Sequence, residues 1–203
     1  MVRVKICGIT NIADALQAVA SGADAIGLVF HEQSPRFVFP EQAATIVRAL
    51  PPFVQAVGLF VNAELAFVNG TIDRCRLDLA QLHGDEPPEY CDHVNRRVIK
   101  AFRMKDISSL DPIKNYRVAG YLLDAHSPKV YGGTGTTFNW EIAKGAEKYG
   151  PVILAGGLTP DNVRLAVERV APYAVDVSGG VEVTPGKKDP EKVREFIRRA
   201  RGL

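Results

Sequence analysis

Two residues suited to proton transfer end short apolar runs. Cys7 ends the run 2–7, and Asp124 ends Tyr121-Leu122-Leu123-Asp124. A free thiol has a pKa of about 8.5, close to the range of a useful base, and a nearby cation such as Lys5 is expected to lower the pKa of Cys7. A carboxyl group in apolar surroundings favours its neutral, proton-donating form. Residue type alone leaves two alternatives open, a packing role for Cys7 and a helix-capping or loop-ordering role for Asp124.

A pair of glycines follows each of the last two strand-like runs. The first pair is Gly156-Gly157 after Val152-Ile153-Leu154-Ala155, and the second is Gly179-Gly180 after Val175-Asp176-Val177-Ser178. Glycine lets the backbone approach a ligand closely, and successive backbone N–H groups in such turns bind anions. The two pairs together predict a phosphate-binding site.

Arg36 and His83 are further candidates. Arg36 lies in Ser34-Pro35-Arg36-Phe37, where its guanidinium could bind a carboxylate or phosphate through two hydrogen bonds. His83 ends Gln81-Leu82-His83-Gly84 and could carry a proton, bind a metal or serve as a hydrogen-bonded structural histidine. Spacing does not exclude a metal site built from separate strand ends, with the ligands His31, His83, Asp124 and Asp176.

The elements that must position these residues alternate between strand and helix. Eight β-branched or apolar runs predict strands, at 2–7, 25–30, 55–61, 77–83, 98–103, 120–125, 152–155 and 174–178. Amphipathic segments such as 11–21, 40–50 and 189–201 lie between them. The segment 106–116 is interrupted by Pro112 and predicts a short or broken fifth helix.

This alternation predicts an α/β fold, a (β/α)8 TIM barrel. A doubly wound open sheet has the same alternation, but its glycine-rich turn usually follows the first strand, whereas here the glycine pairs follow the last two. Phosphate sites of barrels commonly follow strands seven and eight. Alternation along the first strand directs Lys5 and Cys7 into the barrel, and a buried lysine needs a partner, so we expect an ion pair between Lys5 and Asp176 on the neighbouring last strand.

Composition limits the partners. The 203 residues are 46% hydrophobic and 24% charged with a formal net charge of +2, which favours one domain over 1–203 and gives no indication of nucleic acid or membrane binding. The three cysteines form no C-x-x-C motif, and there is no signal-like N-terminal segment, so a reducing cytoplasm is expected. The glycine-rich segment 125–137, which holds Lys129 and Tyr131, predicts a flap over the substrate.

Several motifs in this order resemble the phosphoribosylanthranilate isomerase family of tryptophan biosynthesis, over essentially the whole chain. They are Lys5-Ile6-Cys7-Gly8-Ile9-Thr10, Ser34-Pro35-Arg36, Gln81-Leu82-His83-Gly84, Leu123-Asp124, Gly132-Gly133-Thr134-Gly135, Ala155-Gly156-Gly157-Leu158 and Val175-Asp176-Val177-Ser178. Two departures are small: Gly179 stands where a serine is frequent, and Asn139 stands where an aspartate is frequent.

The resemblance implies an aldose–ketose isomerase. The reaction would be a cofactor-free and metal-free Amadori rearrangement of N-(5-phosphoribosyl)anthranilate to 1-(2-carboxyphenylamino)-1-deoxyribulose 5-phosphate, by a monomer or homodimer. Asp124 would be the general acid and Cys7 the general base, and Arg36 would bind the anthranilate carboxylate. The remaining expected substrate-binding residues are His83, Gly156, Gly157, Asp176, Ser178, Gly179 and Gly180. Two other functions stay open, a metal-dependent sugar-phosphate epimerase and a non-catalytic phosphosugar-binding barrel.

Overall fold

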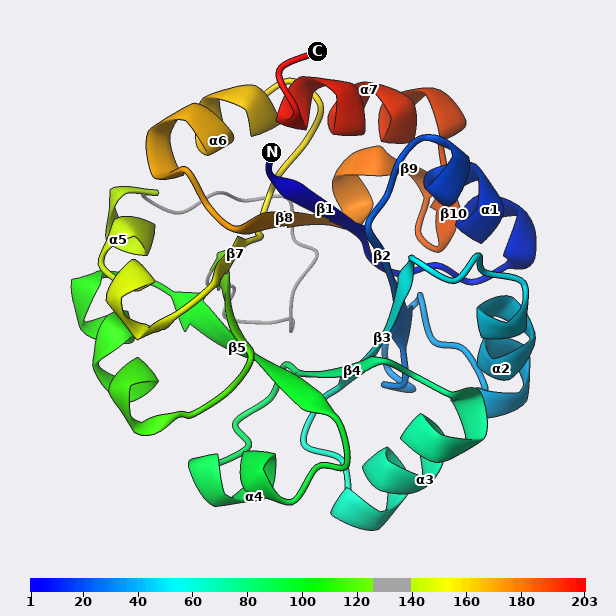
Figure 1. The fold of residues 1–203 in the computed structure, drawn as a ribbon, viewed down its shortest axis with the longest axis horizontal. Coiled ribbons are helices and arrows are strands. Elements are labelled where there is room, and N and C mark those ends of the chain that lie inside the picture. Colours follow the sequence, from blue (N-terminus) through cyan, green and yellow to red (C-terminus); the bar gives the residue numbers. More distant parts are fainter. Residues whose placement is uncertain (126–139) are drawn as a thin grey trace.

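The computed structural model describes residues 1–125 and 140–203, and its eight parallel strands form a closed barrel (Figure 1). The expected flap at 125–137 lies outside the described residues except for Ala125. Strands follow one another around the barrel in chain order, and β1 pairs with β8 to close it. The predicted barrel is therefore confirmed, and closure excludes the doubly wound open sheet.

The barrel strands overlap the predicted runs. They are β1 (Arg3–Ile6), β2 (Ala25–Val29), β3 (Gln55–Phe60), β4 (Leu79–Leu82), β5 (Arg97–Met104), β6 (Gly120–Ala125), β7 (Val152–Leu154) and β8 (Ala174–Val177). Side chains alternate between the barrel interior and the surrounding helices. An interior apolar cluster of Val57, Ile99, Ala101, Leu122, Ile153, Ala155 and Ala174 fills the barrel, separate from the larger core under the helices.

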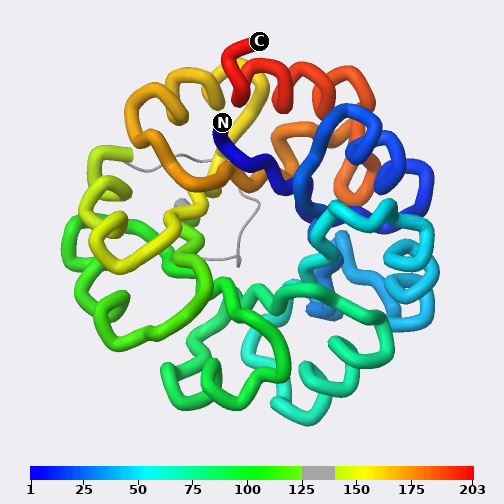
Figure 2. Tube along the Cα trace, in the orientation of Figure 1, coloured from blue at the N-terminus to red at the C-terminus, as the bar shows by residue number. Residues whose placement is uncertain are grey.

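The helices form a ring outside the barrel (Figure 2). They are α1 (Ile12–Ala20), α2 (Pro40–Arg48), α3 (Leu65–Cys75), α4 (Pro88–Asp92), α5 (Glu141–Lys144), α6 (Val163–Val170) and α7 (Pro190–Ala200). In α7 the buried residues Val193, Phe196, Ile197 and Ala200 recur at helical spacing, which gives one apolar face against the barrel. In the part of the chain that the model covers, each helix is too short or too polar to cross a membrane.

Capping side chains begin two of the helices. The Asn11 side chain accepts a hydrogen bond from the N–H of Asp14 and begins α1. Asp189 accepts from the N–H groups of Glu191 and Lys192 and begins α7, with Pro190 in the first turn. These contacts satisfy N–H groups that have no partner within the helix.

The predicted broken helix after β5 is confirmed. Residues Ile107–Asn115 form η1, a 3₁₀ helix that contains Pro112. Proline has no N–H to donate and its ring collides with the preceding turn, so a regular α-helix is not sustained here. Asp106 caps the start of η1 by accepting a hydrogen bond from the N–H of Ser108. A second short 3₁₀ segment, η2 (Glu147–Tyr149), follows α5.

A small hairpin outside the barrel was not predicted. After β8 the chain forms η3 (Gly179–Val181), then β9 (Glu182–Thr184) and β10 (Lys187–Lys188), which pair antiparallel. Pro185 and Gly186 form the turn, and Gly186 has a φ of 83°. The hairpin lies beside α1 (Figure 1), where the N–H of Lys188 donates to Asp14 Oδ2 (2.9 Å).

Candidate active site

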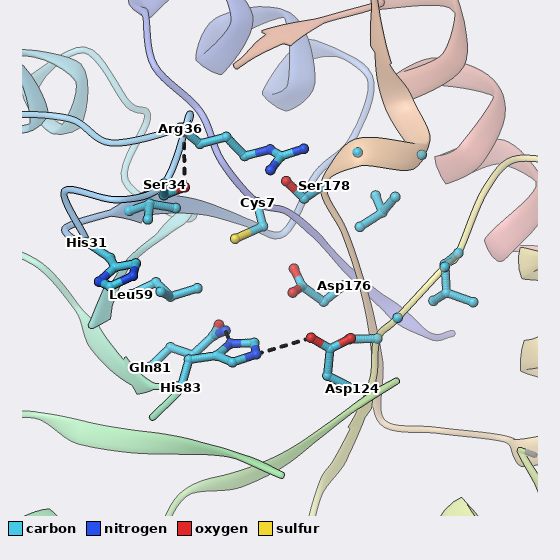
Figure 3. Close-up of a pocket in the computed structure, with 18 of the residues that line it drawn as sticks. Cys7, His31, Ser34, Arg36, Leu59, Gln81, His83, Asp124, Asp176 and Ser178 are labelled. Atoms are coloured by element: carbon cyan, nitrogen blue, oxygen red, sulfur yellow. Dashed lines mark hydrogen bonds and ion pairs between the residues drawn. The ribbon is translucent and has the colours of Figure 1, made fainter. Parts of the chain in front are cut away.

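A cavity of about 290 Å³ opens at the carboxyl ends of the strands (Figure 3). All ten residues predicted for the site line it, from β6 and β8 and from the segments that follow β1, β2, β4, β7 and β8: Cys7, Arg36, His83, Asp124, Gly156, Gly157, Asp176, Ser178, Gly179 and Gly180. Parallel strands carry their carboxyl ends to one face of the barrel, so residues far apart in sequence meet there. The structure thus brings the predicted set together, and the role of each member stays a prediction.

The expected ion pair between Lys5 and Asp176 is confirmed. The two residues stand opposite each other in the β1–β8 register, and Lys5 Nζ lies 2.9 Å from Asp176 Oδ1. Both side chains are buried. Although burial alone would lower the pKa of Lys5, the negative charge of Asp176 and its hydrogen bond raise it above its ordinary value. Lys5 is therefore a permanent cation beside Cys7 at neutral pH.

Lys5 lowers the pKa of the Cys7 thiol as expected, but the net shift is upward. Burial raises the pKa of the Cys7 thiol above its ordinary value, and the lowering effect of Lys5 is too small to reverse this. The negative charge of Asp176 also raises the pKa of Cys7, and it offsets part of the lowering by Lys5. A buried thiolate loses its hydration, so a single paired cation does not compensate for it. The thiol is accordingly the stable form of Cys7 in the free protein.

Gly27 on β2 is a site residue that the sequence analysis missed. A Cβ atom at this position would lie 2.7 Å from Cys7 Sγ and 2.9 Å from Lys5 Nζ. Real Cβ atoms do not approach other atoms so closely, so any larger residue would displace the thiol or the ammonium group. The absence of a side chain at Gly27 lets Cys7 and Lys5 share the interior of the barrel.

Asp124 belongs to a chain of buried hydrogen bonds. His83 Nε2 lies 3.1 Å from Asp124 Oδ2, and His83 Nδ1 lies 2.9 Å from Gln81 Nε2 (Figure 3). With the Gln81 amide donating to Nδ1, the proton of a neutral His83 is on Nε2 and is donated to Asp124. His83, which directly follows β4, thus fixes the direction of the Asp124 carboxyl group on β6.

Arg36 has a partner that was not predicted. Its Nε and Nη2 atoms donate to Glu182 Oε1 (2.9 Å) and Oε2 (2.7 Å), so the expected pair of hydrogen bonds goes to Glu182 of the hairpin. Lys188 Nζ also donates to Glu182 Oε1 (2.7 Å). The only sequence signal was the turn-forming Pro185-Gly186 dipeptide, which indicates a hairpin but not its contact with a residue 146 positions earlier in the chain.

The two glycine pairs lie in contact at the rim. Gly156 and Gly157 have φ values of 82° and 63°, which other residues rarely adopt. A Cβ on Gly180 would lie 2.0 Å from the carbonyl oxygen of Leu158, so the loops after β7 and β8 approach through their backbones. Ser178 Oγ, beside them, is buried and has no hydrogen-bond partner among the residues that the model describes. This polar, backbone-lined corner suits an anion.

The alternative metal site is not assembled in the described residues. No cluster of three or more His, Cys, Asp or Glu side chains within 1–125 and 140–203 is arranged to hold a metal ion. Of the four residues considered, His83 contacts Asp124, and Asp176 is paired with Lys5.

Comparisons with known proteins agree over the whole chain. A family model described as N-(5'phosphoribosyl)anthranilate (PRA) isomerase matches residues 4–199. The N-(5'-phosphoribosyl)anthranilate isomerase of Geobacter sulfurreducens is 74% identical over 202 residues, covering 100% of both chains. The crystal structure of phosphoribosyl anthranilate isomerase from Thermotoga maritima aligns with a TM-score of 0.95 at 45% identity, covering 100% of both chains. A crystal structure of a phosphoribosyl anthranilate isomerase in complex with reduced 1-(o-carboxyphenylamino)-1-deoxyribulose 5-phosphate aligns with a TM-score of 0.91 at 44% identity, again over 100% of both chains.

Proposed function

The chain belongs to the phosphoribosylanthranilate isomerase family, an aldose–ketose isomerase of tryptophan biosynthesis, and we propose that Cys7 and Asp124 are its general base and general acid. The observation that carries this assignment is that both side chains border one cavity at the barrel mouth (Figure 3). Groups on opposite sides of a bound sugar can act in sequence on the same carbon skeleton.

The reaction requires two proton transfers in order. Asp124 donates its proton to the ring oxygen of the ribosyl group as the bond between that oxygen and C1 breaks, which leaves an iminium ion. The Cys7 thiolate then takes the proton from C2, and the electron pair of that C–H bond forms the enolamine. Tautomerisation of the enolamine gives the ketone, and no electrons leave the substrate. The anthranilate nitrogen assists both steps because its lone pair stabilises the iminium ion.

The starting protonation states can arise within the site. A thiolate with a carboxylic acid carries the same total charge as a thiol with a carboxylate, so one proton moved from Cys7 to Asp124 produces the working pair. Lys5 stabilises the thiolate once it forms. His83 accommodates either state of Asp124, because its Nε2 can donate to a carboxylate or accept from an acid.

The two ends of the substrate are bound at separate places. The backbone at Gly156, Gly157, Gly179 and Gly180 would bind the phosphate, and the guanidinium of Arg36 the anthranilate carboxylate, with both lining the cavity. Binding at both ends aligns C1 and C2 between Asp124 and Cys7, and such alignment supplies much of the rate enhancement in reactions of this type. Asp176, Ser178 and His83 would complete the walls around the sugar.

The finer properties expected from the sequence stay proposals. We propose a monomer or homodimer that acts in the cytoplasm, on a small phosphorylated substrate and without nucleic acid or membrane. The three free cysteines support a reducing compartment. A single domain over 1–203 is supported by the one closed barrel that the described residues form.

Turnover of N-(5-phosphoribosyl)anthranilate tests the proposal directly. Loss of the substrate's fluorescence is followed with a strong chelator present, and undiminished turnover is expected. Activity that disappears with chelator would favour the metal-dependent epimerase. Absence of turnover, with phosphosugar binding retained, would favour the non-catalytic barrel.

A further inference from the structure

The hairpin β9–β10 carries a buried charge cluster that no step of the isomerisation uses. We propose that Glu182, held by Lys188, is a positioning residue that orients the Arg36 guanidinium toward a carboxylate and so makes the site selective for substrates with an acidic ring. The proposal rests on the proposed function, in which Arg36 binds the anthranilate carboxylate.

The contacts of Arg36 define which of its N–H groups are available. A guanidinium has five N–H donors, and Glu182 takes the one on Nε and one of the two on Nη2. The remaining donors lie on the far edge of the same plane. Because two parallel hydrogen bonds fix a plane as well as a position, Glu182 determines where that free edge points. Arg36 lines the cavity, so the free edge is available to a ligand there.

The charge balance of the cluster also fits an anionic ligand. Burial alone would raise the pKa of Glu182, but hydrogen bonds and charges from Arg36 and Lys188 lower it below its ordinary value, so Glu182 is ionised. Arg36 and Glu182 alone would form a neutral pair with no net attraction for an anion. The Lys188 side chain is 1% exposed, and its Nζ lies 2.7 Å from Glu182 Oε1. With Lys188 protonated, the three residues together carry one positive charge in excess.

The hairpin is hydrogen-bonded to the start of the chain at its turn and at β10. Thr10 Oγ1 donates to the carbonyl oxygen of Gly186 (2.6 Å), and the N–H of Lys188 donates to Asp14 Oδ2 (2.9 Å). The hairpin pairs with no barrel strand (Figure 1). Its contacts therefore position Glu182 rather than close the barrel.

Gly8 brings Arg36 against the first strand. A Cβ on Gly8 would lie 2.5 Å from Arg36 Cδ and 2.8 Å from Ser178 Oγ, and the φ of Gly8 is 75°. The stem of Arg36 thus rests on the backbone at Gly8 while its head is held by Glu182. Both ends of the side chain are restrained, as a preorganised binding group requires.

Positioning and simple charge screening predict opposite results for Glu182→Gln. If Glu182 only weakened the positive charge of its neighbours, its removal would tighten the binding of a carboxylate. If Glu182 orients Arg36, the freed guanidinium loses its alignment, and carboxylate binding weakens despite the added positive charge. The sign of the change distinguishes the two.

The experiment measures binding of two ligands by calorimetry at pH 7. One is the reduced product analogue, with its ring carboxylate, and the other is the same molecule without the carboxylate. For Glu182→Gln we expect the carboxylated ligand to bind about tenfold more weakly or worse, and the other ligand to bind as it does to the wild type. In turnover, KM should rise more than kcat falls. An unchanged or tighter affinity for the carboxylated ligand would overturn the proposal.

Two controls separate the proposal from other failures. Glu168→Gln, which removes a surface partner of Arg164, should leave both affinities unchanged. Competitive inhibition by inorganic phosphate should be the same in Glu182→Gln and the wild type, because the glycine pairs are untouched. If Glu182→Gln does not fold, Glu182→Asp gives a second comparison, because it keeps the negative charge but shortens the side chain that holds Arg36. Charge screening alone predicts an unchanged affinity for the carboxylated ligand, and that result would reject the proposal.

The proposed function fails separately from this inference. Lack of turnover by the wild type would refute the function. If the Arg36→Met variant binds both ligands with wild-type affinity, Arg36 does not bind the carboxylate. Suppose that the wild type is active and that Arg36→Met loses affinity only for the carboxylated ligand. Wild-type affinities in Glu182→Gln would then contradict only the role of Glu182.

Discussion

Lys5 and Asp176 stand in register across the seam that closes the barrel, with Lys5 Nζ 2.9 Å from Asp176 Oδ1. This buried pair joins the first strand to the last directly below the cavity. The ion pair places a cation beside Cys7, and it couples closure of the barrel to the electrostatics of the active site.

Breaking this pair should destabilise the protein strongly. Lys5→Met or Asp176→Asn leaves one buried charge without a partner, and each should lower the free energy of unfolding by about 3–5 kcal/mol. The double variant should lose less than the sum, which urea denaturation at pH 7 measures. Strict additivity would show that the two charges do not interact. For comparison, Glu168→Gln breaks an exposed pair and should cost at most about 0.5 kcal/mol.

The pH dependence of this contribution has a definite sign. The pKa of Lys5 is raised on folding, so its stabilising effect is complete below the ordinary lysine pKa of about 10.4 and is lost only as the pH rises through the higher folded value. The stability difference between wild type and the double variant Lys5→Met/Asp176→Asn, which leaves no unpaired carboxylate, should therefore be constant across neutral pH. A difference that disappears between pH 6 and pH 8 would contradict this.

Replacing the acid or the base should abolish most turnover without loss of the fold. Cys7→Ser and Asp124→Asn should each lower kcat by about 10² to 10⁴-fold, the usual contribution of one general acid or base. Circular dichroism and phosphate inhibition establish that each variant is folded. Near-normal kcat in either variant would reject its assigned role.

The Cys7 thiol should react slowly with alkylating agents at neutral pH. Burial raises its pKa, and only the thiolate is nucleophilic, so its alkylation by iodoacetamide should accelerate as the pH rises above about 8.5. Mass spectrometry of the Cys7 peptide separates it from Cys75 and Cys91, and burial raises the pKa of Cys91 to about 11. Rapid, pH-independent alkylation of Cys7 between pH 6 and pH 7 would mean that Lys5 outweighs burial.

A methyl group at Gly27 should damage catalysis rather than binding. In Gly27→Ala the new Cβ would occupy space within 2.7 Å of Cys7 Sγ, and the displaced thiol should lower kcat by about 10²-fold. Gly70→Ala is the matched control, because the added group on α3 would have no atom within 4 Å apart from its chain neighbours and the backbone of its own helix. That variant should keep full activity and gain about 0.5–1 kcal/mol of stability from helix propensity. Full activity of Gly27→Ala would exclude the crowding described here.

Arg36 should act on substrate binding more than on turnover. Arg36→Met removes the carboxylate contact but leaves Glu182 paired with Lys188, so the variant should fold. KM should rise by at least about tenfold with a smaller change in kcat, because the contact exists in the ground state as well as the transition state. An unchanged KM would exclude the contact.

The barrel and the residues that line its mouth could be predicted from the order of the amino acids alone. Strand periodicity places Cys7, His83 and Asp124 at the ends of their strands, and the order of eight strands requires those ends to meet at one face. The pairing of Lys5 with Asp176 followed from the same reasoning, because a buried lysine needs a neighbour of opposite charge. These inferences depend on local patterns that each strand carries in its own residues.

The contacts and protonation states of these groups could not be predicted in this way, because they depend on the packed fold. Glu182 reaches Arg36 from a hairpin 146 positions away, and nothing in either local pattern specifies that contact. The pKa of Cys7 depends on the balance between burial and Lys5, and that balance is set by how completely the barrel encloses both groups. The need for glycine at position 27 likewise arises from the distance between neighbouring strands. Contact, burial and crowding are properties of packed atoms in three dimensions, whereas periodicity is a property of the chain.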